Sequence, residues 1–62
     1  MTIAEFAIVE IVGDHELAGA VGTVVMVYAN GEAYEVEFRA QGDGAFVETV
    51  EARYVRDTLA NP

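Results

Sequence analysis

Cysteine, serine, lysine and tryptophan are absent from this chain of 62 residues, and histidine and proline each occur once. Without cysteine there is no disulfide framework, no thiolate zinc site and no cysteine nucleophile. Without serine and lysine, the remaining nucleophiles are threonine, tyrosine and carboxylates, none with an evident activating base. These absences predict a protein that is not an enzyme and uses no cofactor.

Positive charge is scarce, because 3 arginines stand against 11 acidic residues for a net charge of −8. Nucleic acid and anionic membranes repel such a surface, so neither is expected as a partner. Acidic residues also interrupt the apolar N-terminal third, which leaves no segment of the roughly 18 apolar residues that cross a bilayer. The first five residues lack the basic start of a secretory signal, so we expect a cytoplasmic protein.

Hydrophobic residues make up 53% of the chain, whereas disordered chains have a hydrophobic content too low to form a core. The chain should therefore fold, and its length suits one small domain. We expect a single domain over residues 1–58 and a C-terminal tail over residues 59–62.

The sequence reads as strand almost throughout. Residues 34–39 alternate between apolar and charged side chains, which predicts a half-buried antiparallel strand with Tyr34, Val36 and Phe38 on the core side. Residues 21–28 form a β-branched run that is typical of a strand. The Asn-Gly pair between the two runs favours a tight hairpin turn.

Three further strands are expected, over residues 6–12, 46–50 and 55–57, with one 3₁₀ turn at residues 52–54. Five short strands cover their edges best by curling into a barrel. The order of long loop, two hairpins, 3₁₀ turn and last strand predicts an all-β, SH3-like five-stranded barrel, with an oligonucleotide-binding-type barrel as the alternative. Gly22 stands where such a barrel needs a sharp bend or a close backbone approach.

Residues 19–28 and 30–38 carry a Gly-x-Val-Gly-Thr-Val-Val segment, a turn and a Tyr-Glu-Val-Glu-Phe strand. Together with residues 49–56, they resemble the bacterial domain-of-unknown-function family 4926 over roughly residues 5–57. The positions that depart from the family pattern are Ala20, Met26 and the pair Val50 and Glu51. The resemblance implies an SH3-like fold and an antitoxin or immunity-like role, and it supplies no active-site residues.

His15 lies between Asp14 and Glu16 in the long loop, where it could act as a metal ligand or a general base. No second histidine and no cysteine is present to complete a zinc site. An ordinary loop histidine is therefore the preferred interpretation, and no metal site is expected.

The facing of the strands decides what the surface offers to a partner. If Val25 and Val27 pack with the core residues of the 34–39 strand, then Val24, Met26 and Tyr28 face outward. On the fourth strand, Phe46 shares a face with Glu48, so either a bulge intervenes or Phe46 lies outside and Val47 fills the core. A shift of one residue would instead bury the apolar side chains.

Exposed apolar residues with acidic neighbours mark a protein-binding surface. The candidate partner-binding residues are Val24, Met26, Tyr28, Glu35, Glu37, Phe46 and Glu48. We therefore expect a non-enzymatic interaction module, in particular an acidic antitoxin or immunity-type inhibitor of a basic protein. The alternative is a self-associating structural barrel, or an accessory subunit, with a copy of itself or another protein as partner.

Overall fold

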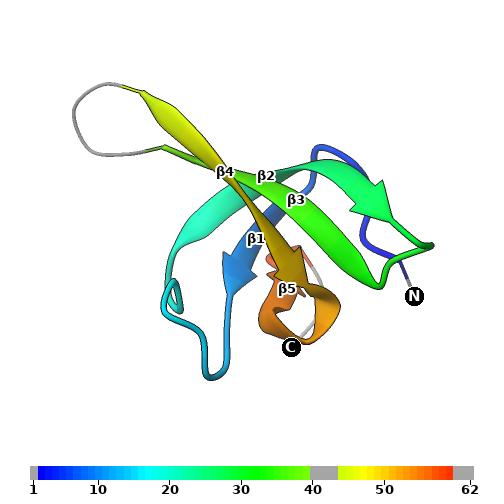
Figure 1. The fold of residues 1–62 in the computed structure, drawn as a ribbon, viewed down its shortest axis with the longest axis horizontal. Helices are drawn as coiled ribbons and strands as arrows, with labels where there is room; N and C mark the ends of the chain where they lie inside the picture. Colours follow the sequence, from blue (N-terminus) through cyan, green and yellow to red (C-terminus); the bar gives the residue numbers. More distant parts are fainter. Residues whose placement is uncertain (1, 40–43, 60–62) are drawn as a thin grey trace.

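The computed structural model describes residues 2–39 and 44–59, and it contains five strands and one 3₁₀ turn (Figure 1). The elements are β1 (Ile8–Ile11), β2 (Val21–Tyr28), β3 (Ala33–Arg39), β4 (Ala45–Glu51), η1 (Ala52–Tyr54) and β5 (Val55–Asp57). The described residues contain no helix long and apolar enough to cross a membrane.

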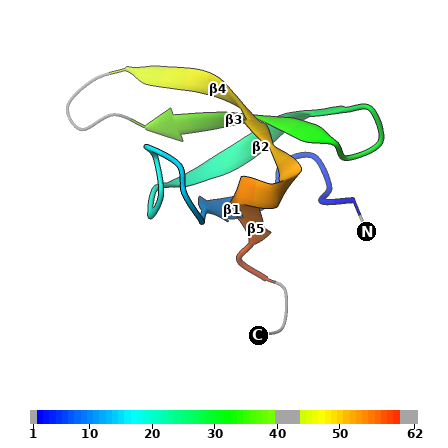
Figure 2. The same cartoon turned by 60° about the horizontal axis from the view of Figure 1, so that its bottom comes forward.

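All five strands belong to one antiparallel sheet with the order β4-β3-β2-β1-β5. The sheet curls strongly, so that the β3–β4 hairpin and the β1–β5 pair lie at different levels in Figure 2. The predicted all-β class and the 3₁₀ turn before the last strand are confirmed. Within the described ranges β4 and β5 do not pair, so closure of the sheet into a barrel stays a prediction.

The inside of the curl is filled by side chains from every strand. Tyr34, Val36 and Phe38 are at most 3% exposed, as the alternation of β3 predicts. Among the residues that the structure describes, the buried apolar side chains are those of Val9, Ile11, Val24, Tyr34, Val36, Phe38, Val50 and Val55. Each such side chain contributes roughly 1.5–3 kcal/mol on full burial, so this cluster is the main source of stability.

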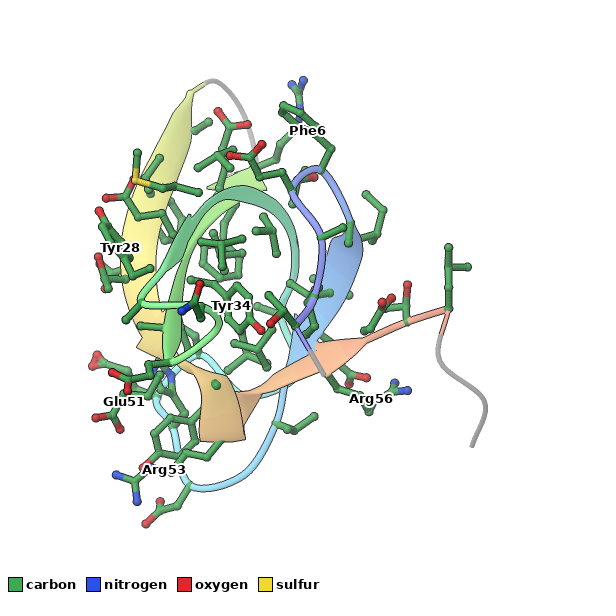
Figure 3. All side chains as sticks on the ribbon, turned by 90° about the vertical axis from the view of Figure 1, so that its right-hand side faces the viewer. Phe6, Tyr28, Tyr34, Glu51, Arg53 and Arg56 are labelled. Atoms are coloured by element: carbon green, nitrogen blue, oxygen red, sulfur yellow. The ribbon has the colours of Figure 1, made fainter. Side chains whose placement is uncertain are left out.

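The Tyr34 ring lies in the interior of the curled sheet (Figure 3). Its hydroxyl accepts a hydrogen bond of 3.1 Å from the backbone N–H of Ile3. A buried hydroxyl without a partner would cost about 1–3 kcal/mol, so this bond fixes the N-terminal segment over the core.

The close approach expected at Gly22 is present where β2 begins to pair with β3. A Cβ atom on Gly22 would lie 2.7 Å from the Glu37 carbonyl oxygen and 2.7 Å from Val36 Cγ1. A backbone oxygen held in a sheet cannot move aside cheaply. Gly22 is therefore required for the packing of β2 on β3.

A register shift between Val24 and Met26 changes the facing of β2. Val24 pairs with Val36 and Met26 pairs with Glu35, so Val25 is the extra residue of a bulge. The expectation that Val24 faces outward is wrong, because Val24 is fully buried before the bulge. Beyond the bulge, Met26 is 45% exposed as expected and Val27 packs against the core.

Strand β4 follows β3 without a register shift over seven residue pairs. Phe46 is opposite Phe38 and therefore lies on the inner face, whereas Val47 is opposite Glu37 on the other face. Neither of the two expected arrangements is right, since the β3–β4 ladder has no bulge and Val47 is 49% exposed rather than in the core.

The β2–β3 turn has the predicted Asn-Gly pair, with φ angles of 58° at Asn30 and 103° at Gly31. The left-handed conformation begins one residue earlier than expected, at Ala29 with φ 48°. The backbone N–H groups of Gly31 and Glu32 both donate to the Tyr28 carbonyl. These two bonds close the turn despite the unfavourable conformation of Ala29.

The first strand is shorter than the predicted residues 6–12. Phe6 adopts φ 70°, which interrupts the extended chain, and β1 begins at Ile8. The chain still follows β2, because Phe6 N–H donates to the Val24 carbonyl and Val24 N–H donates to the Ala7 carbonyl. In the long loop after β1, the apolar Leu17 packs against the core.

Replacing Gly22 by alanine should lower the free energy of unfolding by about 2–3 kcal/mol, because the methyl group collides with the backbone of β3. Urea denaturation of the two proteins measures this loss. Gly19→Ala is the control, since Gly19 has φ 93° but open space around its Cβ position. It should cost only about 1–2 kcal/mol of backbone strain. Equal losses in both variants would contradict the close approach.

The bulge predicts unequal stability losses for Val24 and Met26, which simple alternation would place on the same face of β2. Val24→Ala should destabilise the fold by about 2–3 kcal/mol, because it leaves a cavity in the core. Met26→Ala should cost about 0.5 kcal/mol, because Met26 is exposed. Chemical denaturation measures both losses, and similar values would contradict the register shift.

Candidate partner-binding surface

The convex side of β2, β3 and β4 carries most of the predicted partner-binding residues. Met26 is opposite Glu35, and Glu37 lies between Thr23 and Val47. Cross-strand partners share a face, which gives the membership of this surface. The outer face consists of Val21, Thr23, Met26, Tyr28, Ala33, Glu35, Glu37, Arg39, Ala45, Val47, Thr49 and Glu51.

The outer face is striped along its strands. On β2 it presents Val21, Met26 and Tyr28, which are 56%, 45% and 38% exposed. On the neighbouring strand β3 it presents Glu35 and Glu37, followed by the exposed Arg39 at the end of the strand. An apolar stripe thus runs beside an acidic one, rather than forming an apolar centre with an acidic rim.

Four of the seven predicted residues meet on this face, namely Met26, Tyr28, Glu35 and Glu37. Val24 belongs to the core and cannot contact a partner. Phe46 and Glu48 lie on the inner face of β4, opposite Phe38 and Val36. Both are nevertheless exposed, because β4 is an edge strand and projects beyond the core.

The Phe46 ring stacks on Phe38, with centroids 5.2 Å apart and ring planes at 26°. This contact covers the end of the core, and 42% of Phe46 remains exposed. Phe46 therefore combines a packing role with an accessible aromatic surface.

The candidate surface gains two exposed apolar residues that the sequence interpretation did not include, Val21 and Val47. Simple alternation along residues 46–50 predicts that Val47 lies on the outer face, because Phe46 and Val50 lie on the inner face at even spacing. For Val21 the signal is its two-residue spacing from Thr23, which predicts the outer face only once the facing of β2 is known.

Tyr28 and Glu35 are joined across the outer face. The Tyr28 hydroxyl donates a hydrogen bond to the Glu35 carboxylate. This bond, with a smaller effect of desolvation and of the negative charge, raises the pKa of Tyr28 above its ordinary value of 10.0. The pair fixes the aromatic ring beside the acidic stripe.

Two of the three arginines are held in exposed ion pairs. Arg53 contacts Glu51 at 3.0 Å and lies 4.8 Å from the centroid of the Tyr54 ring, and Arg56 contacts Glu10. Figure 3 shows Arg53 and Arg56 on different sides of the molecule. A shallow depression lies beside the first pair, lined by Glu32, Glu51, Ala52 and Arg53. Exposed pairs contribute about 0–1 kcal/mol, so their main effect is local charge neutralisation.

His15 has contacts that position the long loop. Its Nδ1 atom accepts a 3.0 Å hydrogen bond from the backbone N–H of Leu17. Its ring meets the Tyr54 ring edge-on, with centroids 5.1 Å apart. In the part of the chain that the structure describes, no three histidine, aspartate or glutamate side chains gather closely enough to hold a metal ion.

The Tyr28–Glu35 bond predicts a residue-specific change in titration. Glu35→Ala should lower the pKa of Tyr28, because it removes both the acceptor and the negative charge. Ring chemical shifts followed by NMR over alkaline pH separate Tyr28 from the other two tyrosines. Because the folded pKa is the higher one, the bond stabilises the fold below the pKa of the unfolded tyrosine. That contribution is lost as the pH rises through the folded pKa. Glu37→Ala is the control, and an equal shift in both variants would contradict the assignment.

Comparison with known proteins gives a family and no characterised relative. No curated protein and no solved structure matches the chain significantly. The family model described as "Domain of unknown function (DUF4926)" matches residues 5–56, which include all five strands except the last residue of β5. The family expected from the sequence is therefore confirmed, and the chain belongs to the DUF4926 family.

Proposed function

We propose that this domain is a cytoplasmic, non-enzymatic interaction module that binds a basic protein through its outer face. An acidic antitoxin or immunity-type inhibitor is the specific role that fits this proposal. The observation that carries it is the apolar stripe of β2 beside Glu35 and Glu37 of β3.

The two stripes have complementary effects on binding. Burial of Val21, Met26 and Val47 against a partner would supply affinity, at about 25 cal/mol per Å² of apolar surface. The carboxylates would favour a basic partner and disfavour an acidic one. The net charge of −8 extends this preference over the whole molecule and would speed encounter with a positive surface.

A second candidate function is self-association as a structural barrel. It is favoured by the position of β4 at the end of the sheet, where its exposed residues include Phe46 and Val47. The charge of each copy opposes this assembly, because two copies bring together a charge of −8 each. The basic partner is therefore the preferred proposal.

Two variants with the same total charge test the outer face. The outer-face variant combines Glu35→Gln with Glu37→Gln. The loop variant, which is the control, combines Asp14→Asn with Glu16→Gln. Each variant changes the net charge from −8 to −6 (−8 + 2). The control positions are exposed in the loop after β1. Tagged wild-type and variant proteins are used to capture partners from native lysate at low and high salt, followed by quantitative mass spectrometry.

A basic protein should be captured by the wild type and by the loop variant at low salt, and released at high salt. Its recovery with the outer-face variant should fall about tenfold, because the two lost charge pairs together contribute roughly 1.4 kcal/mol. Equal recovery with both variants would contradict the outer face as the binding site. Recovery of only the protein itself would favour self-association.

A further inference from the structure

Strand β4 is an edge strand whose protection against pairing comes only from its two glutamates. It occupies one end of the strand order, and its ladder with β3 continues through seven residue pairs without a bulge. Natural edge strands are commonly protected by lysine, proline, bulges or short length. The β4 sequence Ala-Phe-Val-Glu-Thr-Val-Glu contains no lysine or proline, and its residues 45–49 are all exposed.

The side chains of β4 show what kind of strand the edge can accept. Phe46 and Val47 offer one exposed apolar residue on each face of the sheet. Glu48 follows on the inner face and Glu51 on the outer face, and both are exposed. An added strand would be stabilised by apolar residues opposite the first two and by a basic residue opposite Glu48, whereas Glu51 already pairs with Arg53.

Glu48 also disfavours a second copy of this chain on the same edge. A charge on the inner face of an edge strand is a device that blocks pairing between like sheets. Two β4 strands would bring together two Glu48 carboxylates, which no basic residue of β4 offsets. The edge is therefore selective, since the charges that oppose a copy attract a basic segment.

We propose that the edge of β4 that has no partner strand among the described residues receives an extended basic segment of a protein partner, which adds to the sheet as a sixth strand. This inference rests on the proposed function, because it specifies which part of the basic partner binds. Backbone hydrogen bonds would supply affinity without regard to sequence, and the alternating side chains would supply selectivity. Phe46, which stacks on Phe38, would extend the apolar core onto the new strand.

A synthetic peptide of the same length as β4 tests the inference directly. The peptide Lys-Val-Thr-Lys-Val-Val-Thr is designed to pair antiparallel with β4. Its two lysines then lie opposite Glu51 and Glu48, and its adjacent valines at positions 5 and 6 lie opposite Val47 and Phe46. The control peptide has the same side chains and methylated backbone nitrogens, so it cannot donate ladder hydrogen bonds. Each is added at about 1 mM, a concentration that detects weak binding, and backbone amides are followed by NMR and hydrogen exchange.

The pairing peptide should shift the amides of β4 and slow their hydrogen exchange about tenfold or more, and the methylated peptide should do neither. Equal binding by both peptides would overturn the edge inference while leaving a basic partner in place. Lack of binding by the pairing peptide would also overturn it, and the capture experiment with the outer-face variants decides the proposed function separately. Slow exchange of β4 in a dimer of the protein alone would assign the edge to a second copy and overturn the inference.

A charge exchange at one position separates strand pairing from general attraction between opposite charges. The second peptide, Lys-Val-Thr-Glu-Val-Val-Thr, differs only at the residue opposite Glu48. Wild-type protein should bind the first peptide about fivefold more tightly, and Glu48→Lys should reverse the order. The Glu48→Lys variant still has a negative net charge of −6 (−8 + 2). Attraction to the whole molecule would therefore favour the more basic peptide in both proteins. Absence of the reversal would overturn the register and the inference.

Discussion

The close approach of β2 to β3 at Gly22 is the constraint on which the rest of the structure depends. Strand β2 pairs with β1 near its start and with β3 along most of its length, so it must bend from one half of the sheet to the other. Gly22 allows the contact with β3, and the bulge at Val25 then rotates the strand. Together they place Val24 in the core and leave Met26 and Tyr28 on the outer face.

Most of the fold could be predicted from local patterns in the sequence. The alternation of residues 34–39, the Asn-Gly turn and the 3₁₀ turn before the last strand each have a local physical cause. The bulge in β2 has no such signal, because the run Val24, Val25, Met26, Val27 is apolar at every position. Its register is set by packing against Val36 and by the hydrogen bonds of the N-terminal segment.

The candidate surface was harder to predict than the fold, because it depends on that register. Beyond the bulge the predicted facing of Met26 and Tyr28 holds, whereas before it the facing of Val24 is reversed. In β4 the acidic Glu48 on the inner face conflicts with a simple pattern of apolar inside and polar outside. That conflict arises because β4 extends past the core, where an inner-face side chain remains in solvent.

The pairing of the first strand with the last also constrains how the domain can form during synthesis. Strands β2, β3 and β4 follow one another as hairpins and can pair as soon as they leave the ribosome. Strand β1 pairs on its other side with β5, through Val9 opposite Asp57 and Ile11 opposite Val55. One side of β1 therefore stays open until residues 55–57 have emerged. A nascent chain halted before residue 55 would expose a second edge beside the core, which gives chaperones and other extended chains a site that the finished domain no longer offers.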